Sequence, residues 1–226
     1  MKNLHLSIQG LLLFLFFTNT SYSQINVSVT GNTNTSPNLA VSYTSLNDAL
    51  TALNAVTSMS GAVTLTCNAG SETAPSATGF TLGSASLNPV LSATNTISIV
   101  ASGTVTLNAA VGASTPSSAS PDGIFKIVGA DYITINGLTF NDGNTTNPAS
   151  MEYGLALFKA GVDDGSQNNT ISNCIFNMDR NNFATGTTPM VEGSVGILII
   201  NSTPTAATTV LTPTVAAGTN SFNKIY

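Results

Sequence analysis

The stretch DYITINGLTF, Asp131 to Phe140, returns further along the chain as QNNTISNCIF, Gln167 to Phe176. The two copies start 36 residues apart and align without a gap, so that apolar positions meet apolar ones and turn-forming positions meet turn-forming ones. The aligned pairs include Ile135 with Ile171, Asn136 with Ser172, Gly137 with Asn173, Leu138 with Cys174 and Phe140 with Phe176. Similarity between copies that are separated by long insertions indicates a solenoid, in which each copy stacks on the one before it.

A third copy begins near the end of the printed sequence. We align SFNKIY, Ser221 to Tyr226, so that Phe222 takes the place of Ile171 and Asn223 the place of Ser172. One phase of the repeat then carries a short polar side chain in every copy, namely Asn136, Ser172 and Asn223. These side chains either hydrogen-bond from copy to copy, as ladders do in stacked strands, or are ordinary turn formers.

The third copy stops before the residue that would match Phe176, and no polar cap follows it. An uncapped last strand offers unpaired backbone groups to other chains. We therefore expect this chain to be the N-terminal part of a longer protein, and to self-associate through its C-terminal end.

The first residues have the order of a secretory signal. Lys2 precedes seven consecutive apolar residues, Leu11 to Phe17, and Ser21 and Ser23 flank Tyr22. This pattern predicts export with cleavage after Ser23, so that the protein is secreted or lies at the cell surface. The apolar run is too short for a membrane span, which needs about 20 residues, and no later segment is long enough. The predicted organisation is a signal peptide over residues 1–23, an extended entry segment over 24–43 and a repeat domain over 44–226.

The composition excludes one large class of partners. Without residues 1–23, the chain has ten acidic and four basic residues, a net charge of −6. Four scattered basic residues cannot form the positive surface that binds a phosphate backbone, so nucleic acid is not an expected partner. Charged residues make up 7% of the chain and hydrophobic residues 42%, which suits stacked strands with polar turns better than disorder.

One segment has helical periodicity. Its apolar residues Leu46, Ala49, Leu50 and Leu53 follow the spacing i, i+3, i+4 and i+7, and Ser45 with Asp48 resembles a capping box. The other apolar runs are short, alternating and bounded by Gly, Ser, Asn or Pro, as β-strands are. Crossover helices between them are missing, which disfavours a doubly wound α/β fold and makes all-β the predicted class. Within that class, the repeat favours a solenoid over an antiparallel sandwich. The longest polar segments are expected to project as lateral loops: Asn141 to Glu152, Asn177 to Ser194 and Asn201 to Thr219.

Two cysteines, Cys67 and Cys174, make a disulfide chemically allowed in an exported protein. Each also occupies an apolar position of a strand-like run, where cysteine commonly acts as a small buried hydrophobe. We favour two unpaired thiols, because strands so far apart in sequence should not stack directly.

With these features the chain resembles the right-handed parallel β-helix proteins of the pectin-lyase-like superfamily, as found in secreted proteins of Gram-negative bacteria. The resemblance rests on SLNDALTAL before GAVTLTCNAG, which looks like the N-terminal cap and first turn of that family, and on the three copies above. It implies that the helix covers the open end of the coil. It specifies a fold and not an activity, because the family includes polysaccharide lyases, glycoside hydrolases and non-catalytic adhesins.

The candidate site residues are Asp163, Asp164, Asp179 and Arg180. By resemblance to pectate-lyase-like enzymes, such acids would hold Ca²⁺ and the arginine would act as a base. Asp163-Asp164-Gly is also an ordinary turn, and Asp179-Arg180 is also an ordinary surface pair. The hydrolases of the family use a Gly-His-Gly motif, whereas the one histidine here is His5, inside the predicted signal.

Two functions follow as hypotheses. The first is a non-catalytic surface or adhesive module that contacts a polysaccharide or cell-surface glycan and needs no cofactor. The alternative is a carbohydrate-active enzyme, a polysaccharide lyase or glycoside hydrolase, in which the three acids and Arg180 converge in one groove.

Overall fold

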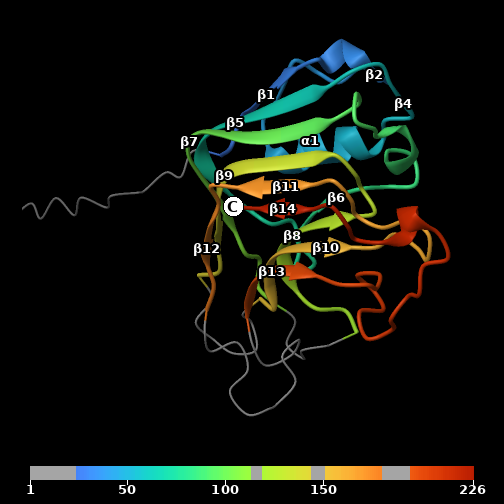
Figure 1. The fold of residues 1–226 in the computed structure, drawn as a ribbon. Coiled ribbons are helices and arrows are strands. Elements are labelled where there is room, and N and C mark those ends of the chain that lie inside the picture. Colours follow the sequence, from blue (N-terminus) through green and yellow to red (C-terminus); the bar gives the residue numbers. More distant parts are fainter. Residues whose placement is uncertain (1–23, 113–118, 144–150, 180–193) are drawn as a thin grey trace, which may run out of the picture.

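A computed structural model describes residues 24–112, 119–143, 151–179 and 194–226 of the chain (Figure 1). The elements are β1 (Val27–Thr30), η1 (Asn32–Asn34), β2 (Thr35–Ser36), β3 (Ser42–Tyr43), α1 (Leu46–Asn54), β4 (Ser58–Met59), β5 (Val63–Thr73), β6 (Phe80–Leu82), η2 (Asn88–Val90), β7 (Ile97–Asn108), β8 (Gly123–Val128), β9 (Ile133–Asn141), β10 (Tyr153–Phe158), β11 (Thr170–Ser172), β12 (Ile175–Asn177), β13 (Val195–Ile199), η3 (Ala216–Gly218) and β14 (Lys224–Ile225).

Two sheets contain most of these strands, and the chain alternates between them. The large sheet has the order β14-β11-β9-β7-β5-β1-β3, with β12 also beside β9, and the small sheet has the order β13-β10-β8-β6. From β5 to β10 each strand of the large sheet is followed by one of the small sheet, and β13 of the small sheet then follows β11 and β12 of the large one. Neighbours among these strands are parallel. β1 and β3 join the large sheet antiparallel, and β2 pairs antiparallel with β4. The structure is therefore mostly β with parallel sheets, as the all-β prediction requires.

The first two copies of the repeat are neighbours in the large sheet, as predicted. Ile171 pairs with Ile135 and Phe176 with Phe140, in parallel register. The chain bends between these pairs, at the position where Gly137 has φ 79 and Asn173 has φ 53. A left-handed backbone favours glycine or asparagine, which explains why these two residue types align.

The predicted alignment of the third copy is wrong. β14 pairs with β11 so that Ile225, and not Phe222, lies opposite Ile171. Phe222 is 77% exposed and has φ 59, which matches the left-handed backbone of Asn168 at φ 55. The alignment placed Phe222 at a core position because its side chain is apolar. In the structure Phe222 occupies the bend before the strand.

Of the two alternatives for the polar phase of the repeat, hydrogen bonding from copy to copy holds for Asn136 and Ser172, and Asn223 is not part of their row. The Ser172 hydroxyl lies 3.2 Å from Asn136 Oδ1, which also accepts a hydrogen bond from Asn173 Nδ2 at 2.8 Å. Asn223 lies in another phase of the repeat, where its Oδ1 accepts a hydrogen bond from the Asn169 backbone N–H at 2.9 Å.

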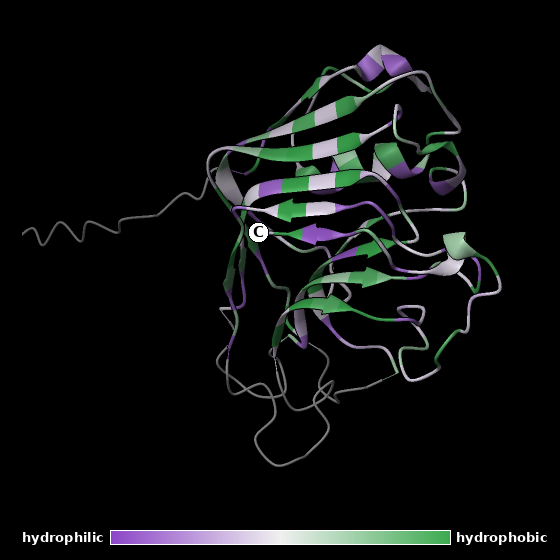
Figure 2. Ribbon diagram, viewed as in Figure 1, coloured by the Kyte–Doolittle hydropathy of each residue, from purple (hydrophilic) through white to green (hydrophobic). Residues whose placement is uncertain are grey.

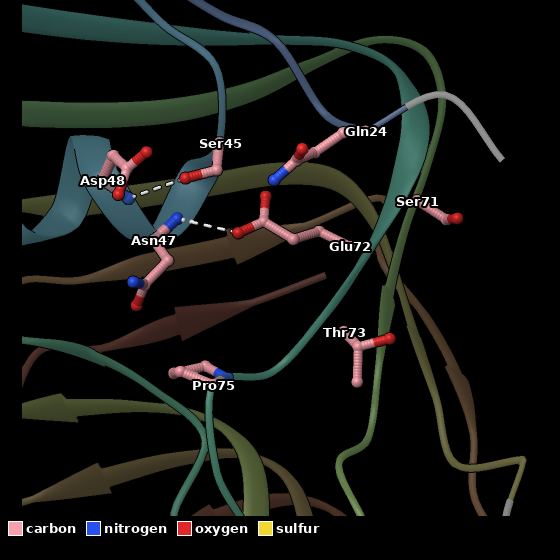
Figure 3. A pocket seen from close by; sticks show the side chains of 8 residues that line it. All are labelled: Gln24, Ser45, Asn47, Asp48, Ser71, Glu72, Thr73 and Pro75. Carbon is pink, nitrogen blue, oxygen red and sulfur yellow. Dashed lines mark hydrogen bonds between the residues drawn. The ribbon is translucent and has the colours of Figure 1, made fainter.

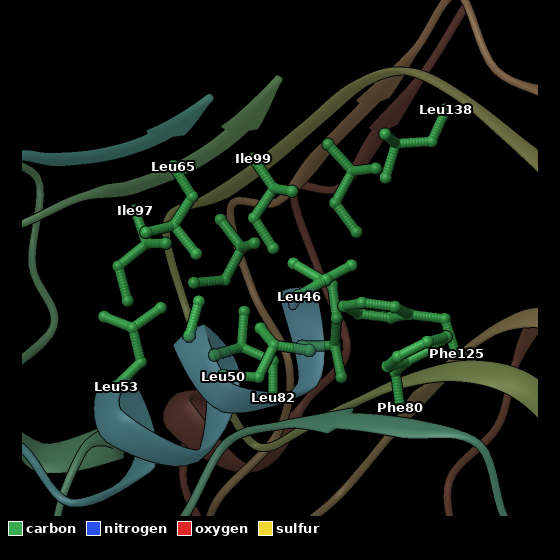
Figure 4. Close-up of a cluster of buried hydrophobic side chains, with 14 of the residues drawn as sticks. Leu46, Leu50, Leu53, Leu65, Phe80, Leu82, Ile97, Ile99, Phe125 and Leu138 are labelled. Atoms are coloured by element: carbon green, nitrogen blue, oxygen red, sulfur yellow. The ribbon is translucent and has the colours of Figure 1, made fainter. Parts of the chain in front are cut away.

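The hydrophobic core lies between the two sheets. Apolar and polar residues alternate along the strands of the large sheet, whereas β10 and β13 are mostly apolar (Figure 2). The predicted helix forms as α1, and its N-cap Ser45 accepts a hydrogen bond from Asp48 N–H at 3.0 Å. Its buried residues Leu50 and Leu53 lie among side chains from both sheets (Figure 4). None of the helices in the described ranges is long and apolar enough to span a membrane.

The prediction that the segment from Asn201 to Thr219 projects sideways holds only in part: residues 208–217 are mostly exposed, but the first part, residues 201–207, does not project. It folds back over the outer face of β10, where Ala207 packs against Ala156 and Phe158. Two backbone hydrogen bonds hold it there: Lys159 N donates to Ser202 O at 3.0 Å, and Ala207 N donates to Ala119 O at 2.8 Å. β10 is consequently buried on both faces.

Cys67 and Cys174 are free thiols, as favoured from the sequence. Cys67 is fully buried in β5, and burial raises its pKa to about 12. A thiol with so high a pKa is protonated and unreactive at neutral pH.

Candidate functional site

Two of the four candidate residues form one tight turn after β10. Gly161 and Asp164 are joined as an isolated bridge, with Asp163 between them. The Asp163 carboxylate accepts hydrogen bonds from the Thr214 hydroxyl and the Thr214 N–H, both at 2.7 Å. These bonds, led by the one from the hydroxyl, hold the pKa of Asp163 below its usual value. The carboxylate thus fastens the segment that covers β10.

Asp164 has a different environment from its neighbour. Its Oδ2 accepts a hydrogen bond from Asn88 Nδ2 at 3.2 Å, and partial burial raises its pKa. Asn88 also donates to Val128 O, so this contact ties the turn to η2 and to the end of β8. Both aspartates therefore have structural contacts in the turn.

The third acid lies at the other end of β10. Asp179 follows β12, and its carbonyl oxygen accepts a hydrogen bond from the Ser194 hydroxyl, which also lies 3.0 Å from Met151 O. Met151 precedes β10, whereas Asp163 follows it. Six residues of strand span about 20 Å, so the structure does not bring Asp179 together with Asp163 and Asp164. Arg180 lies outside the described residues.

The resemblance to pectate-lyase-like enzymes implied that these acids would hold Ca²⁺. The described part of the chain contains no group of three or more His, Cys, Asp or Glu side chains placed to share a metal ion. Ca²⁺ takes six to eight oxygen ligands, whereas this turn offers two carboxylates that both already accept hydrogen bonds from protein.

A second acidic region lies beside α1. A hollow of about 460 Å³ is lined by Gln24, Asp48 and Glu72, among others (Figure 3). The Glu72 carboxylate accepts hydrogen bonds from Leu46 N–H at 2.6 Å and Asn47 N–H at 3.0 Å, and so caps the first turn of the helix. Desolvation raises the pKa of Glu72, and the two N–H donors oppose that rise. This carboxylate serves the helix N-terminus.

A second hollow, of about 480 Å³, lies where the turn after β10 meets the covering segment. It is lined by Lys159 and Asp164 together with Ser84, Thr203 and Thr205. Lys159 is fully buried, and its Nζ donates to Leu211 O at 3.2 Å. A side chain without exposed surface cannot meet a ligand unless the covering segment moves.

A further arrangement of polar side chains lies on the outer face of the large sheet, after the bends in β5, β7 and β9. We call it the ladder groove, and its volume is about 510 Å³. It is lined by Gly70, Ser71, Thr104, Thr106, Asn108, Thr139, Asn141 and Asn177. None of these residues is charged.

Strand register builds the ladder groove from two parallel rows. One row is Ser71, Thr106 and Thr139, and the next strand continues it with Ile175. The second row starts at Thr73 and continues with Asn108, Asn141 and Asn177. Each row places equivalent side chains on neighbouring strands, about 4.8 Å apart.

The polar groups of the groove are largely available to a ligand. Within the described ranges, the hydroxyls of Ser71, Thr106 and Thr139 make no hydrogen bond to protein. Asn141 Nδ2 donates to Asn108 Oδ1 at 3.1 Å, which orients the amides and leaves each with further hydrogen-bonding capacity. The groove can therefore offer both donors and acceptors.

The sequence analysis missed this groove, although the sequence carries a signal for it. TLN, TFN and IFN close the equivalent strands at residues 106–108, 139–141 and 175–177. The two aligned stretches end at Phe140 and Phe176, one residue before the asparagines Asn141 and Asn177. Outward-facing residues of the same repeat mark the candidate site.

The comparisons with known proteins do not identify this chain. No protein-family model, no curated protein and no solved structure matches it.

Proposed function

We propose that this chain is an exported, non-catalytic surface module built as a right-handed parallel β-helix, and that it contacts glycans through the ladder groove. The alternation of the chain between two parallel sheets supports the β-helix interpretation, since a solenoid visits each sheet once per turn. The predicted signal over residues 1–23 supports export.

The observation that carries the proposal is the outward row of hydroxyl and amide groups across neighbouring strands. Sugars present vicinal hydroxyls, each both donor and acceptor, and Thr and Asn side chains match that capacity. Hydrogen-bonding groups that already stand in a fixed array lose little freedom when a ligand binds, so less of the binding energy is offset by ordering.

The enzyme alternative receives less support from the described residues. It requires Asp163, Asp164, Asp179 and Arg180 in one groove, but the described acids lie at opposite ends of β10. We expect the purified protein to release no unsaturated products from pectate, with or without calcium. Product release that is lost in Arg180→Ala would favour the lyase instead.

Binding to immobilised polysaccharides tests the proposal directly. The protein is passed over a panel of plant and bacterial polysaccharides, and retention is compared with that of Thr106→Val and Thr139→Val. Valine keeps the branched shape of threonine and removes the hydroxyl, so each variant should fold and be retained less. Thr134→Val is the matched control, because Thr134 lies on β9 before the bend, outside the groove. Equal retention of all four proteins would disprove the role of the groove.

A further inference from the structure

We infer that the ligand of the ladder groove is an uncharged, linear polysaccharide that runs across the strands, with about one sugar unit per strand. This inference rests on the function proposed above and specifies the ligand of the same site.

The direction of the ligand follows from the spacing of the rows. Equivalent side chains repeat every strand, about 4.8 Å, which is close to the length of one sugar unit in an extended chain. A polymer that crosses the strands therefore meets the same groups at each unit. A polymer that runs along one strand meets outward side chains only at every second residue, about 7 Å apart, and this spacing does not match one sugar unit.

The width of the groove suits one sugar ring. Thr139 and Asn141 are two residues apart on β9, and both point outward. Two residues of strand span about 7 Å, so the hydroxyl row and the amide row can contact opposite edges of one ring. The Asn108 and Asn141 amides are already oriented by their mutual hydrogen bond.

The absence of charge among the lining residues selects the class of polysaccharide. A uronate or sulfate group would lose water in the groove without meeting a cation, which is costly. The chain as a whole carries a net charge of −5, which repels anionic polymers further. Neutral glucans, xylans and mannans carry no charged group, so they have neither this desolvation cost nor this repulsion.

The length of the site follows from where the hydroxyl row ends. Ser71, Thr106 and Thr139 supply hydroxyls on three strands, and Ile175 takes the fourth place with a side chain that is 56% exposed. An exposed isoleucine can pack against the C–H face of a sugar ring but cannot bond its hydroxyls. We therefore expect affinity to grow with ligand length up to about four units and then to level off.

Calorimetric titration with oligosaccharides of increasing length tests the inference. The probes are β-1,4-linked gluco-, xylo- and manno-oligosaccharides, with oligogalacturonates as the acidic comparison. We expect at least one neutral series to bind with a Kd that falls with each added unit up to about four and changes little with salt. Thr106→Val combined with Thr139→Val should raise that Kd roughly tenfold, while Thr134→Val leaves it unchanged.

The possible failures are distinguishable. Tighter binding of oligogalacturonates than of every neutral series, or equal affinity for single sugars and oligomers, would overturn this inference and leave glycan binding in place. Absence of binding to any oligosaccharide and to every immobilised polysaccharide would overturn both this inference and the proposed function.

Discussion

Single carboxylates set much of the local structure of this protein. Glu72 lies on β5, far in sequence from α1, yet it caps the first two N–H groups of that helix. Ser45 caps the third helical residue, Asp48. The sequence predicted a capping box of Ser45 and Asp48, whereas in the structure a local serine and a distant glutamate share the capping. A sequence pattern cannot show the second partner, because the sheet brings it there.

Asp131 should make stability depend on pH. Its Oδ1 accepts a hydrogen bond from Gln167 N–H at 2.6 Å, and desolvation raises its pKa to about 6. The folded state therefore holds this proton more tightly than the unfolded state, whose pKa is about 3.9. The resulting stabilisation is complete below about pH 4 and is lost as the pH rises to about 6.

Thermal unfolding of Asp131→Asn, followed by circular dichroism between about pH 4 and 7, checks this. Asparagine keeps the acceptor for Gln167 N–H and removes the titration. The variant should lose less stability than the wild type as the pH rises through this window. Parallel curves for the two proteins would show that Asp131 does not titrate as described.

At the scale of elements, α1 contributes to the core through one face. Leu46, Ala49, Leu50 and Leu53 are all buried. Figure 4 shows the three leucines among the side chains of the core. Leu50→Asp would bring a charge into that apolar environment and should reduce the free energy of unfolding by about 2 to 5 kcal/mol. Thr51→Asp, at an exposed position of the same helix, is the control and should have a small effect. Denaturant titration measures both, and equal midpoints would mean that the helix is not docked.

Asparagine side chains join successive copies just before their strands. Asn169 is fully buried, its Oδ1 accepts from Ile133 N–H at 2.8 Å, and its Nδ2 donates to Ala130 O at 3.0 Å. Asn223 repeats this pattern one copy later, with Asn169 N–H and Ser166 O as its partners. The two side chains are equivalent parts of one ladder between copies.

Removing the two amides should have unequal effects. Asn169→Ala leaves a buried N–H and a buried C=O without partners and should destabilise the fold by about 2 to 4 kcal/mol. Asn223→Ala should cost less, because Asn223 is only half-buried and water can replace it. Chemical denaturation of both variants measures the two losses in the free energy of unfolding. An equal loss would contradict the dependence on burial.

At the scale of the whole molecule, we propose export with cleavage after Ser23. Ile25 is fully buried and β1 begins at Val27, so cleavage there keeps the described fold intact. Expression of the complete sequence in a Gram-negative host should yield extracytoplasmic protein whose first residue is Gln24. N-terminal sequencing of the fractionated protein measures this. Cytoplasmic protein that retains Met1 would contradict export.

The sequence by itself determined the features that lie within short segments: the strand-rich class, the position of α1, and the register of the first two copies, whose bends fall at Gly137 and Asn173. These depend on local periodicity and backbone preference, which neighbouring residues encode. The tertiary structure decided the register of β14, the capping of α1 by Glu72, and the ladder groove. Each of these joins residues from different turns of the chain. Insertions of variable length separate such residues in sequence, and stacking of the strands brings them together.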